Sequence, residues 1–430
     1  MSYLKSPTPL KADNGGGGKL YFIACCFPPF GRGNAITNSC VANFLSESFS
    51  LKVVCMKLSR GGLISYQEDE SLEKKIYPNI DVTRIEGANW WGMNTALYLL
   101  GLFPCYFLNW AWNVWRKRDE IFSERGVVFA VYPVFSDLIL GYFISRKKNM
   151  PLLIDFRDDF SGVMARGWRK IFHPFYRFYE EKIVDSAQIV TVTTEALKQD
   201  ILSRYNISSD KVVVVNNIVP TIARKRDVSS PRKLPFSVIY AGAMSKVQQP
   251  EILLKAYHYL CQDDANWQNL LKVDFYGPAS PYFNMKIRSY IGDGCNFGGF
   301  LPQEEINALI SSSDIGFLSL SDPIYAYATP TKLFDYIECG VPIVACLPEG
   351  AARSMILDLE IGLVAEVGDV AGLADCLRRM VDDDQLRIKF RQQMVKVRKR
   401  FRPEIQVRIW KDLLVDMGMG TTSDPIDIHG

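Results

Sequence analysis

Short apolar runs alternate with longer stretches of helical periodicity along most of the chain. Leu20–Cys26 (LYFIACC) precedes a loop rich in proline and glycine, and a helical pattern over Ala35–Phe49 and a second apolar run at Leu51–Met56 follow it. This strand–loop–helix–strand order predicts the start of a parallel α/β sheet. Four later runs predict further buried strands at Val127–Tyr132, Leu152–Asp155, Ile189–Thr193 and Val212–Asn216.

The pattern restarts after a polar, proline-containing segment at residues 221–235. New strands are predicted at Phe236–Tyr240, Lys272–Tyr276, Ile315–Leu318 and Pro342–Ala345, with helices at Glu251–Leu260, Glu304–Ser311 and Thr331–Glu338. Two successive halves of this kind predict an α/β protein with two Rossmann-like domains facing each other across a cleft. We expect a flexible lead-in (1–19), an N-terminal domain (20–220), a hinge linker (221–235), a C-terminal domain (236–401) and a C-terminal helix (402–430) that packs back on the N-terminal domain.

Composition narrows the class of protein without changing this division. The 430 residues are 48% hydrophobic and 23% charged, with a net charge of +3, which fits two globular domains and leaves no dense basic patch for nucleic acid. Ten scattered cysteines and three histidines have no zinc-ligand spacing, so we expect reduced, buried thiols, no metal and no cofactor. The N-terminus lacks a signal-peptide pattern, which favours a cytoplasmic protein.

One uncharged segment challenges a purely soluble interpretation. Thr95–Trp115 is followed by three basic residues and is long enough to span a membrane, although Pro104, Asn109 and Asn113 interrupt it. A span would also separate strands that belong to one sheet. Three alternatives stay open: a span, a buried helix, and an aromatic helix at the membrane interface. The last would give a peripheral contact at the inner face of the membrane.

In the first half, two strand-end segments carry candidate chemistry. Gly31-Arg32-Gly33 lacks the third glycine of the dinucleotide fingerprint, so it is interpreted either as a tight turn or as a loop that approaches phosphate or sugar. Asp155–Asp159 (DFRDD) follows a buried strand and is interpreted either as a helix cap or as a group that orients sugar hydroxyls and stabilises charge.

In the second half, the helix predicted at Thr331–Glu338 begins beside Pro330, with Thr329 as its expected N-cap. Free N–H groups at its start and the charge of Lys332 would attract an anion. Asp335, three residues later, shares a face with Lys332 and could bind ribose hydroxyls. The alternative is an ordinary ion pair on a solvated helix.

The order of elements and these motifs resemble the retaining glycosyltransferases of GT-B fold in the large family four, the glycosyl transferases group 1. The resemblance extends over most of the chain, from about Leu20 to Arg402. It rests on several short motifs in the family's order: Phe27-Pro28-Pro29, Ile154–Asp158, Ala187–Thr194, Val212–Asn217, Tyr240-Ala241-Gly242, Phe297–Leu301, Ser313-Asp314-Ile315 and Pro330–Val344.

The departures from the family pattern are specific. The second glutamate of the family's donor motif falls on Asp335 and the first on Tyr327, while the usual Arg and Lys fall on Ala243 and Gln248. The sequence is therefore similar to a bacterial sub-group that makes surface polysaccharides, in which Lys332 would supply the missing charge.

The resemblance implies transfer, with retention, from a nucleotide-sugar, in particular a uridine-linked one, to a glycan or polyprenyl-linked acceptor. It implies three catalytic residues, Arg157, Asp158 and Lys332. The implied donor-binding residues are Gly31, Gly33, Gly242, Gln248, Tyr327, Thr331, Lys332 and Asp335. Two alternatives remain: a nucleotide-sugar epimerase of the same fold, and a non-catalytic partner subunit that binds the sugar nucleotide.

Overall fold

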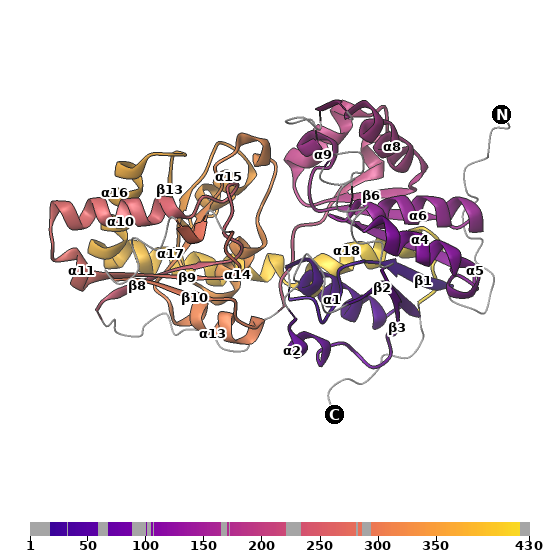
Figure 1. The fold of residues 1–430 in the computed structure, drawn as a ribbon, viewed down its shortest axis with the longest axis horizontal. Coiled ribbons are helices and arrows are strands. Elements are labelled where there is room, and N and C mark those ends of the chain that lie inside the picture. Colours follow the sequence, from indigo (N-terminus) through magenta and orange to yellow (C-terminus); the bar gives the residue numbers. More distant parts are fainter. Residues whose placement is uncertain are drawn as a thin grey trace. The chain divides into compact units, whose positions relative to one another are not determined.

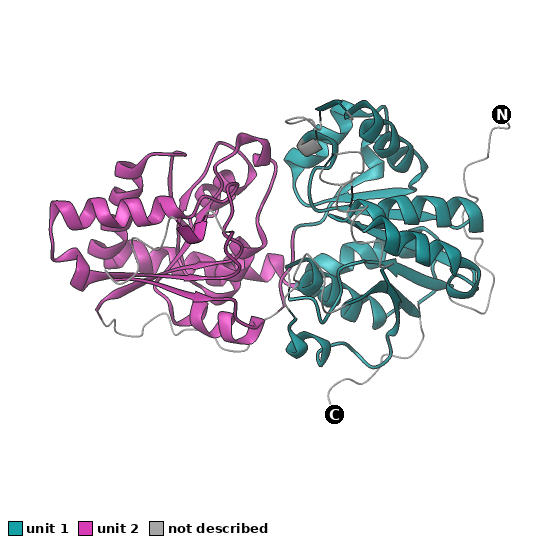
Figure 2. Cartoon of the chain, in the orientation of Figure 1, with its two compact units in different colours: residues 1–216, 403–430 teal, residues 217–402 magenta. Residues whose placement is uncertain are grey.

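The computed structural model describes residues 18–31, 33–58, 68–87, 100, 105, 107–164, 170–171, 173–220, 234–280, 283–285 and 294–421. The chain divides into two compact units (Figure 2). Unit 1 runs to Asn216 and resumes at Pro403, and unit 2 is Asn217–Arg402. The expected lead-in and the expected linker, apart from the last two residues of each, lie outside the described residues.

Unit 1 contains a seven-stranded sheet in the order β3-β2-β1-β4-β5-β6-β7, and each pair of neighbours is parallel (Figure 1). The order reverses between β1 and β4, which is the topological switch point where Rossmann-type sheets bind ligands. The strands are β1 (Lys19–Ile23), β2 (Leu51–Lys57), β3 (Asp81–Glu86), β4 (Gly126–Tyr132), β5 (Leu152–Phe156), β6 (Ile189–Val192) and β7 (Val212–Val214).

Helices cover this sheet, and the last helix that the structure describes is one of them. Helix α18 packs against α1, and Lys411 on α18 pairs with Glu47 just after α1. The helices are α1 (Gly33–Ser46), α2 (Glu70–Glu73), α4 (Leu108–Arg116), α5 (Arg118–Ile121), α6 (Phe135–Lys148), α7 (Ser161–Met164), α8 (His173–Ser186), α9 (Glu195–Arg204) and α18 (Pro403–Asp416), with a 3₁₀ turn η2 (Ser209–Lys211).

Unit 2 repeats the same topology with six parallel strands in the order β10-β9-β8-β11-β12-β13. Its switch point lies between β8 and β11, and apolar clusters fill both faces of the sheet. The strands are β8 (Phe236–Ala241), β9 (Leu271–Tyr276), β10 (Cys295–Gly299), β11 (Ile315–Ser319), β12 (Ile343–Cys346) and β13 (Gly362–Ala365).

Helices and 3₁₀ turns connect these strands. One of them, α14, ends where Gly340 adopts a left-handed conformation with φ 70°, which glycine tolerates and which turns the chain into β12. The elements are α10 (Glu251–Asp263), α11 (Trp267–Leu270), α13 (Gln303–Ser312), η3 (Pro323–Tyr325), α14 (Thr331–Cys339), α15 (Ala351–Asp358), α16 (Val370–Asp382), α17 (Asp384–Val397) and η4 (Arg398–Phe401).

Two halves of α/β type agree with the sequence prediction, and the predicted strands lie within a few residues of the observed ones. Three strands were not predicted. β3 (DVTRIE) is polar because it lies at the edge of its sheet, while β10 and β13 are short edge strands of the other sheet.

The uncharged segment Thr95–Trp115 is described only in part. Its second half contains α4, where Trp110 is buried and Trp112 is 60% exposed. Among the helices that the structure describes, none combines the length and apolarity that a membrane span requires.

Candidate functional site

Each unit has a polar region at its own switch point, where two diverging strands end. In unit 2 this region is formed by the end of β8 and the start of α14. In unit 1 it is formed by the ends of β1, β4 and β5 together with α1.

Lys332 is the central charged residue of the unit 2 region. It lies in the first turn of α14, is 9% exposed, and places its ammonium nitrogen 3.8 Å from the centroid of the Tyr240 ring. The Nζ atom is buried and has no hydrogen-bond partner within the described structure. A buried ammonium group is costly unless an anion or acceptor pairs with it. The ammonium group is therefore available to pair with an anion.

Gly242 makes the position of Lys332 possible. It follows β8 with φ +139°, a conformation that side chains rarely adopt, and its N–H donates to the carbonyl of Tyr276. A Cβ atom at this position would lie 3.0 Å from both Cε and Nζ of Lys332. The absence of a side chain thus lets the lysine lie directly against the backbone at the strand end.

Lys332 and Asp335 have strongly altered protonation. Burial lowers the pKa of Lys332 to about 7, and the carboxylate of Asp335 opposes that shift. Burial also raises the pKa of Asp335 to about 7, against the attraction of Lys332. Shifts of this size, caused by burial and a specific charged neighbour, are typical of functional sites. A bound anion would restore the charge of Lys332.

The Tyr336 hydroxyl bridges β8 and β11 at the switch point of unit 2, where the two strands diverge. Strand β11 pairs with β8 at Ile315 and Gly316, and beyond them the Tyr336 hydroxyl lies between the two strands. The hydroxyl accepts from the N–H of Ala241 at 3.3 Å and lies 3.0 Å from the carbonyl oxygen of Phe317 and 3.2 Å from that of Ile239. A Cβ at Gly316 would lie 2.7 Å from the Tyr336 ring, so this position must be glycine.

The start of α14 differs from the sequence prediction. Pro330, not Thr329, is the capping residue, and no side chain caps the helix. The Thr329 hydroxyl oxygen is buried without a hydrogen-bond partner in the described structure, while the Thr329 carbonyl accepts from the Asn217 amide at 2.8 Å. A proline in the cap position leaves the first helical N–H groups directed at the space before the helix, as an anion site requires.

The other predicted donor residues of unit 2 lie on the adjoining loops and helix. Gln248 accepts a hydrogen bond from the Ser245 hydroxyl after β8. Tyr327 is buried beside Tyr325, with 6.3 Å between ring centroids, in the segment that leads to α14. Thr331 is the half-buried first residue of α14. Gly242 and Lys332 lie directly against each other. Gln248, Tyr327 and Thr331 are close to one or the other of them along the chain.

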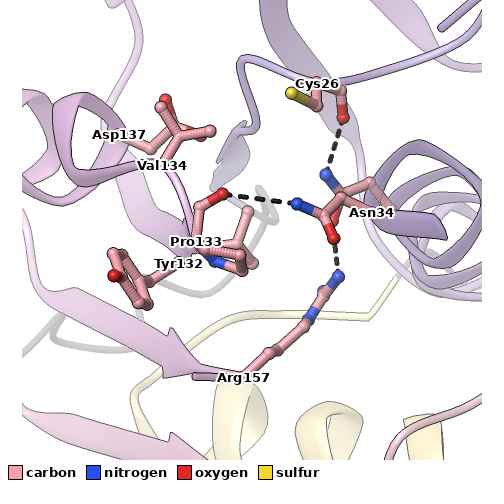
Figure 3. Close-up of a pocket in the computed structure, with 9 residues that line it drawn as sticks. Cys26, Asn34, Tyr132, Pro133, Val134, Asp137 and Arg157 are labelled. Atoms are coloured by element: carbon pink, nitrogen blue, oxygen red, sulfur yellow. Dashed lines mark hydrogen bonds between the residues drawn. The ribbon is translucent and has the colours of Figure 1, made fainter. Parts of the chain in front are cut away.

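A small pocket lies at the switch point of unit 1 (Figure 3). Two asparagines of α1 form its polar wall: Asn34 donates to the carbonyl of Pro133 at 3.4 Å, and Asn38 donates to that of Cys26 at 2.7 Å. The lining residues are Cys26, Asn34, Asn38, Val131, Tyr132, Pro133, Val134, Asp137 and Arg157. Gly31 and Gly33 lie just before and at the start of α1, and Arg32 between them is outside the described residues.

Arg157 projects toward α1 from just beyond β5, as Figure 3 shows. Its Nε donates to Asp155 Oδ2 and its Nη1 to Asn38 Oδ1, each at 2.7 Å. The third nitrogen, Nη2, is buried without a hydrogen-bond partner in the described structure. Two of the three guanidinium nitrogens therefore fix the side chain, and the third is available to a hydrogen-bond acceptor.

The five residues Asp155–Asp159 divide into two groups, and the helix-cap interpretation holds for Asp159, which accepts a backbone hydrogen bond from Gly162 in α7. Asp155 pairs with Arg157, whereas Asp159 pairs at 2.7 Å with Arg204 at the end of α9. Asp158 is partly buried between them. Side chains two residues apart on a strand share a face, but Asp159 lies beyond β5, where the backbone turns toward α7.

Asp137 is a pocket residue that the sequence analysis missed. It lies in the first turn of α6 and accepts a hydrogen bond from the Cys25 N–H at 2.8 Å. Burial raises the pKa of the Asp137 carboxyl well above its usual range, although the Cys25 N–H opposes the shift. The sequence signal for Asp137 was an acidic residue in the first turn of the helix that follows the predicted strand Val127–Tyr132.

Part of the chain matches a known protein family, and the fold matches solved structures. Residues 222–397, which lie within unit 2, match the model of the family described as Glycosyl transferases group 1. The two Rossmann-type sheets form the GT-B fold. HepE of Anabaena in complex with UDP and glucose superposes with a TM-score of 0.68 at 15% identity, over 93% of this chain and 100% of HepE. The sucrose-phosphate synthase of Thermosynechococcus elongatus gives 0.69 at 12% identity, over 93% and 99%.

Particular relatives are about a quarter identical to this chain over an aligned stretch of about half their length. The D-inositol 3-phosphate glycosyltransferase of Corynebacterium efficiens is 25% identical over 242 residues, which is 52% of this chain and 55% of that protein. The protein of the same name from Nocardioides sp. is 24% identical over 227 residues, 48% of this chain and 49% of its own. The chain thus matches about half the length of these curated relatives.

Proposed function

We propose that this protein is a retaining glycosyltransferase that transfers a sugar from a UDP-sugar to a glycan or lipid-linked acceptor in surface-polysaccharide synthesis. The observation that carries the proposal is the buried ammonium group of Lys332, unpartnered in the described structure, beside Gly242 in the unit that matches the family model. A diphosphate is the ligand that this arrangement suits best, because it is anionic and needs close approach of backbone at a strand end and a helix N-terminus.

The choice of nucleotide rests on similar structures. HepE was solved with UDP and glucose and with UDP-glucose, and it shares the fold of this chain. Asp335 would bind the ribose hydroxyls, one turn along α14 from the lysine. Its pKa near 7 means that the carboxylate is available as an acceptor at and above neutral pH.

The reaction requires no protein nucleophile. The acceptor hydroxyl oxygen bonds to the anomeric carbon as the bond from that carbon to the diphosphate oxygen breaks. The hydroxyl proton passes to the departing phosphate oxygen on the same face, so configuration is retained. Lys332 and the start of α14 stabilise the charge that grows on the leaving diphosphate. Arg157 and Asp158 of unit 1 are assigned to positioning hydroxyl groups of the acceptor.

The acceptor is assigned to the pocket of unit 1. Asn34, Asn38 and the free Nη2 of Arg157 offer donors and acceptors to hydroxyl groups at the mouth of this pocket. The relatives are named for D-inositol 3-phosphate, a hydroxylated ring that carries a phosphate. That compound therefore belongs in the acceptor panel beside short glycans and polyprenyl-linked sugars.

A thermal-shift and calorimetric panel of UDP-, GDP- and dTDP-sugars tests the donor assignment, because a ligand selective for the native state stabilises it by mass action. We expect UDP-sugars to raise the melting temperature of the wild-type protein and Lys332→Met to abolish this shift. Lys255→Met, which removes an exposed lysine from α10 in the same unit, is the matched control and should behave as wild type. Equal affinity of the wild type and Lys332→Met for UDP-sugars would show the donor-site assignment to be wrong.

Product analysis then separates an enzyme from a binding subunit. Incubation with the selected UDP-sugar and the acceptor panel should release UDP and yield an α-configured product from an α-linked donor. Donor binding without UDP release on any acceptor, including a membrane extract, would instead favour the non-catalytic subunit.

A further inference from the structure

A buried chain of hydrogen bonds joins the last helix of the chain to the pocket of unit 1. It begins at Trp410 on α18, whose indole Nε1 donates to the Thr191 hydroxyl oxygen at 3.1 Å. The Thr191 hydroxyl lies 2.7 Å from Asp155 Oδ1, and Asp155 Oδ2 accepts from Arg157 Nε at 2.7 Å. Trp410, Thr191 and Asp155 are each no more than 2% exposed.

The chemistry of the groups determines which of them donates and which accepts in each hydrogen bond. An indole N–H can only donate and an ionised carboxylate can only accept, so the Thr191 hydroxyl accepts from Trp410 and donates to Asp155. The alternative acceptor for this hydroxyl, the carbonyl oxygen of Ile154, lies farther away at 3.4 Å. Each member therefore holds the next in one orientation, and the last member is Arg157.

The fold explains why these residues meet. Asp155 and Thr191 are register partners on the parallel strands β5 and β6, so their side chains leave the sheet on the same face. Helix α18 presents Gln406, Trp410 and Leu414 on one buried face at helical spacing. Gln406 accepts from the backbone N–H of Asn216 at 2.9 Å, which anchors the helix one turn before Trp410.

These hydrogen bonds also offset the energetic cost of burying the Asp155 carboxylate. A buried carboxylate is costly unless each oxygen is hydrogen-bonded or paired with a charge. Thr191 satisfies one oxygen of Asp155 and Arg157 the other. If the Thr191 hydroxyl were absent, the carboxylate could rotate and Arg157 would lose its fixed partner. Arg157 Nη1 is held separately by Asn38, so Nη2 is directed only when both supports are present.

We propose that α18 is a positioning element for the active site: Trp410 and Thr191 orient Asp155, which aims the free Nη2 of Arg157 at the ligand in the unit 1 pocket. The proposal rests on the role proposed above for Arg157. Trp410, Thr191 and Asp155 are positioning residues, because none of them is assigned a contact with substrate.

The first test reads the orientation of Arg157 without any substrate. In full-length protein labelled with ¹⁵N-arginine, the Nε–H signal of Arg157, assigned by its loss in Arg157→Lys, should exchange slowly with solvent. We expect exchange to accelerate about two- to tenfold in Thr191→Val and in Trp410→Phe, as the loss of one hydrogen bond predicts. Thr191→Ser, which keeps the hydroxyl, should restore slow exchange.

Lys411→Met is the control on the same helix. It removes the pair with Glu47 and leaves Trp410 in place, so the Arg157 signal should match that of wild type. Wild-type exchange in both Thr191→Val and Trp410→Phe would overturn the proposal, whatever the activity of the protein. Trp410→Phe keeps an aromatic ring beside Phe129, whose centroid lies 5.9 Å from that of Trp410, and circular dichroism verifies that each variant folds.

The second test reads turnover. Thr191→Val should lower kcat about two- to tenfold with little change in the KM for the donor. In an Arg157→Met background, Thr191→Val should not lower kcat further, because the guanidinium group that Thr191 positions is absent. An undiminished effect in that background would contradict positioning through Arg157. If wild type transfers no sugar from any donor, the proposed function fails while the exchange experiment still decides the positioning role.

Discussion

The ammonium group of Lys332 lies over the ring of Tyr240, 3.8 Å from its centroid, in the unit that carries the family match. A desolvated cation on an aromatic face gains about 2 kcal/mol, much less than the cost of removing an ammonium group from water. The ring therefore holds the lysine in place without neutralising it. The remaining cost is relieved when an anion binds.

Donor affinity should depend on pH through this lysine. The free protein holds the pKa of Lys332 at about 7, and a bound diphosphate favours the charged form and raises that pKa. Affinity is therefore fully present below pH 7 and falls as the pH rises above it, by up to about tenfold per pH unit. Ionisation of Asp335 near pH 7 lets its carboxylate accept from the ribose hydroxyls. This effect has the opposite sign and is smaller, because the ribose hydroxyls are neutral and the diphosphate is charged.

Calorimetric titration of a UDP-sugar between pH 6.5 and 9 measures this slope. Lys332→Met should bind weakly at every pH with a clearly shallower slope. A variant slope as steep as that of wild type would assign the pH dependence to another group.

Gly242→Ala should weaken donor binding. The new methyl group would be placed 3.0 Å from Cε and Nζ of Lys332, in a backbone conformation with φ +139° that disfavours any side chain. We expect about 1 kcal/mol of lost stability and at least a tenfold rise in donor Kd, about 1.4 kcal/mol. Gly368→Ala is the matched control, because Gly368 also has a positive φ, +82°, with open space around its Cβ position. It should lose stability and keep donor affinity; equal donor Kd values in the two variants would exclude the contact as the cause.

Asn38→Ala should lower turnover and leave donor affinity nearly unchanged. The asparagine fixes Arg157 Nη1 on one side and the Cys26 carbonyl on the other, and hydrogen bonds to charged groups contribute about 1.5–3 kcal/mol. We therefore expect kcat to fall by at least tenfold. Asn43→Ala on the same helix removes hydrogen bonds to Lys75 and Tyr77 instead, and should keep wild-type turnover. Steady-state kinetics would refute the assignment if both variants lost activity equally.

Tyr336→Phe should destabilise unit 2. Loss of the hydroxyl leaves the N–H of Ala241 without its acceptor at the point where β8 and β11 diverge. A buried group left in this way costs about 1–3 kcal/mol. Tyr259→Phe removes a hydroxyl from an exposed tyrosine of the same unit and is the control. Differential scanning calorimetry should show a lower melting temperature for Tyr336→Phe alone; matching melting curves would argue against the bridging role.

Sequence reasoning predicted the two α/β halves because buried parallel strands leave continuous apolar runs between helical patterns. It also predicted the position of Lys332, because a proline marks the start of a helix and so places the lysine two residues later in the first turn. It missed β3, whose residues alternate in polarity at an edge, and β13, which has four residues.

The pocket of unit 1 was less predictable for a physical reason. Asn38 and Asp137 are ordinary helix residues until the sheet order 3-2-1-4 places their helices beside the same switch point. The division of Asp155–Asp159 into two groups has the same explanation. Asp159 is separated from Arg157 by its pairing with Arg204, which is 45 residues later in the sequence.

The return of the chain to unit 1 at Pro403 has a practical consequence for dissecting the molecule. A fragment that stops at Asn216 would contain every strand of its sheet and still lack the tryptophan that closes one face of it. The Thr191 hydroxyl and the Asn216 N–H would lose their partners, and apolar surface near Phe129 would be uncovered. A stable half-molecule should therefore be made by joining residues 403–421 through a short flexible tether to residue 216, and not by cutting the gene in two.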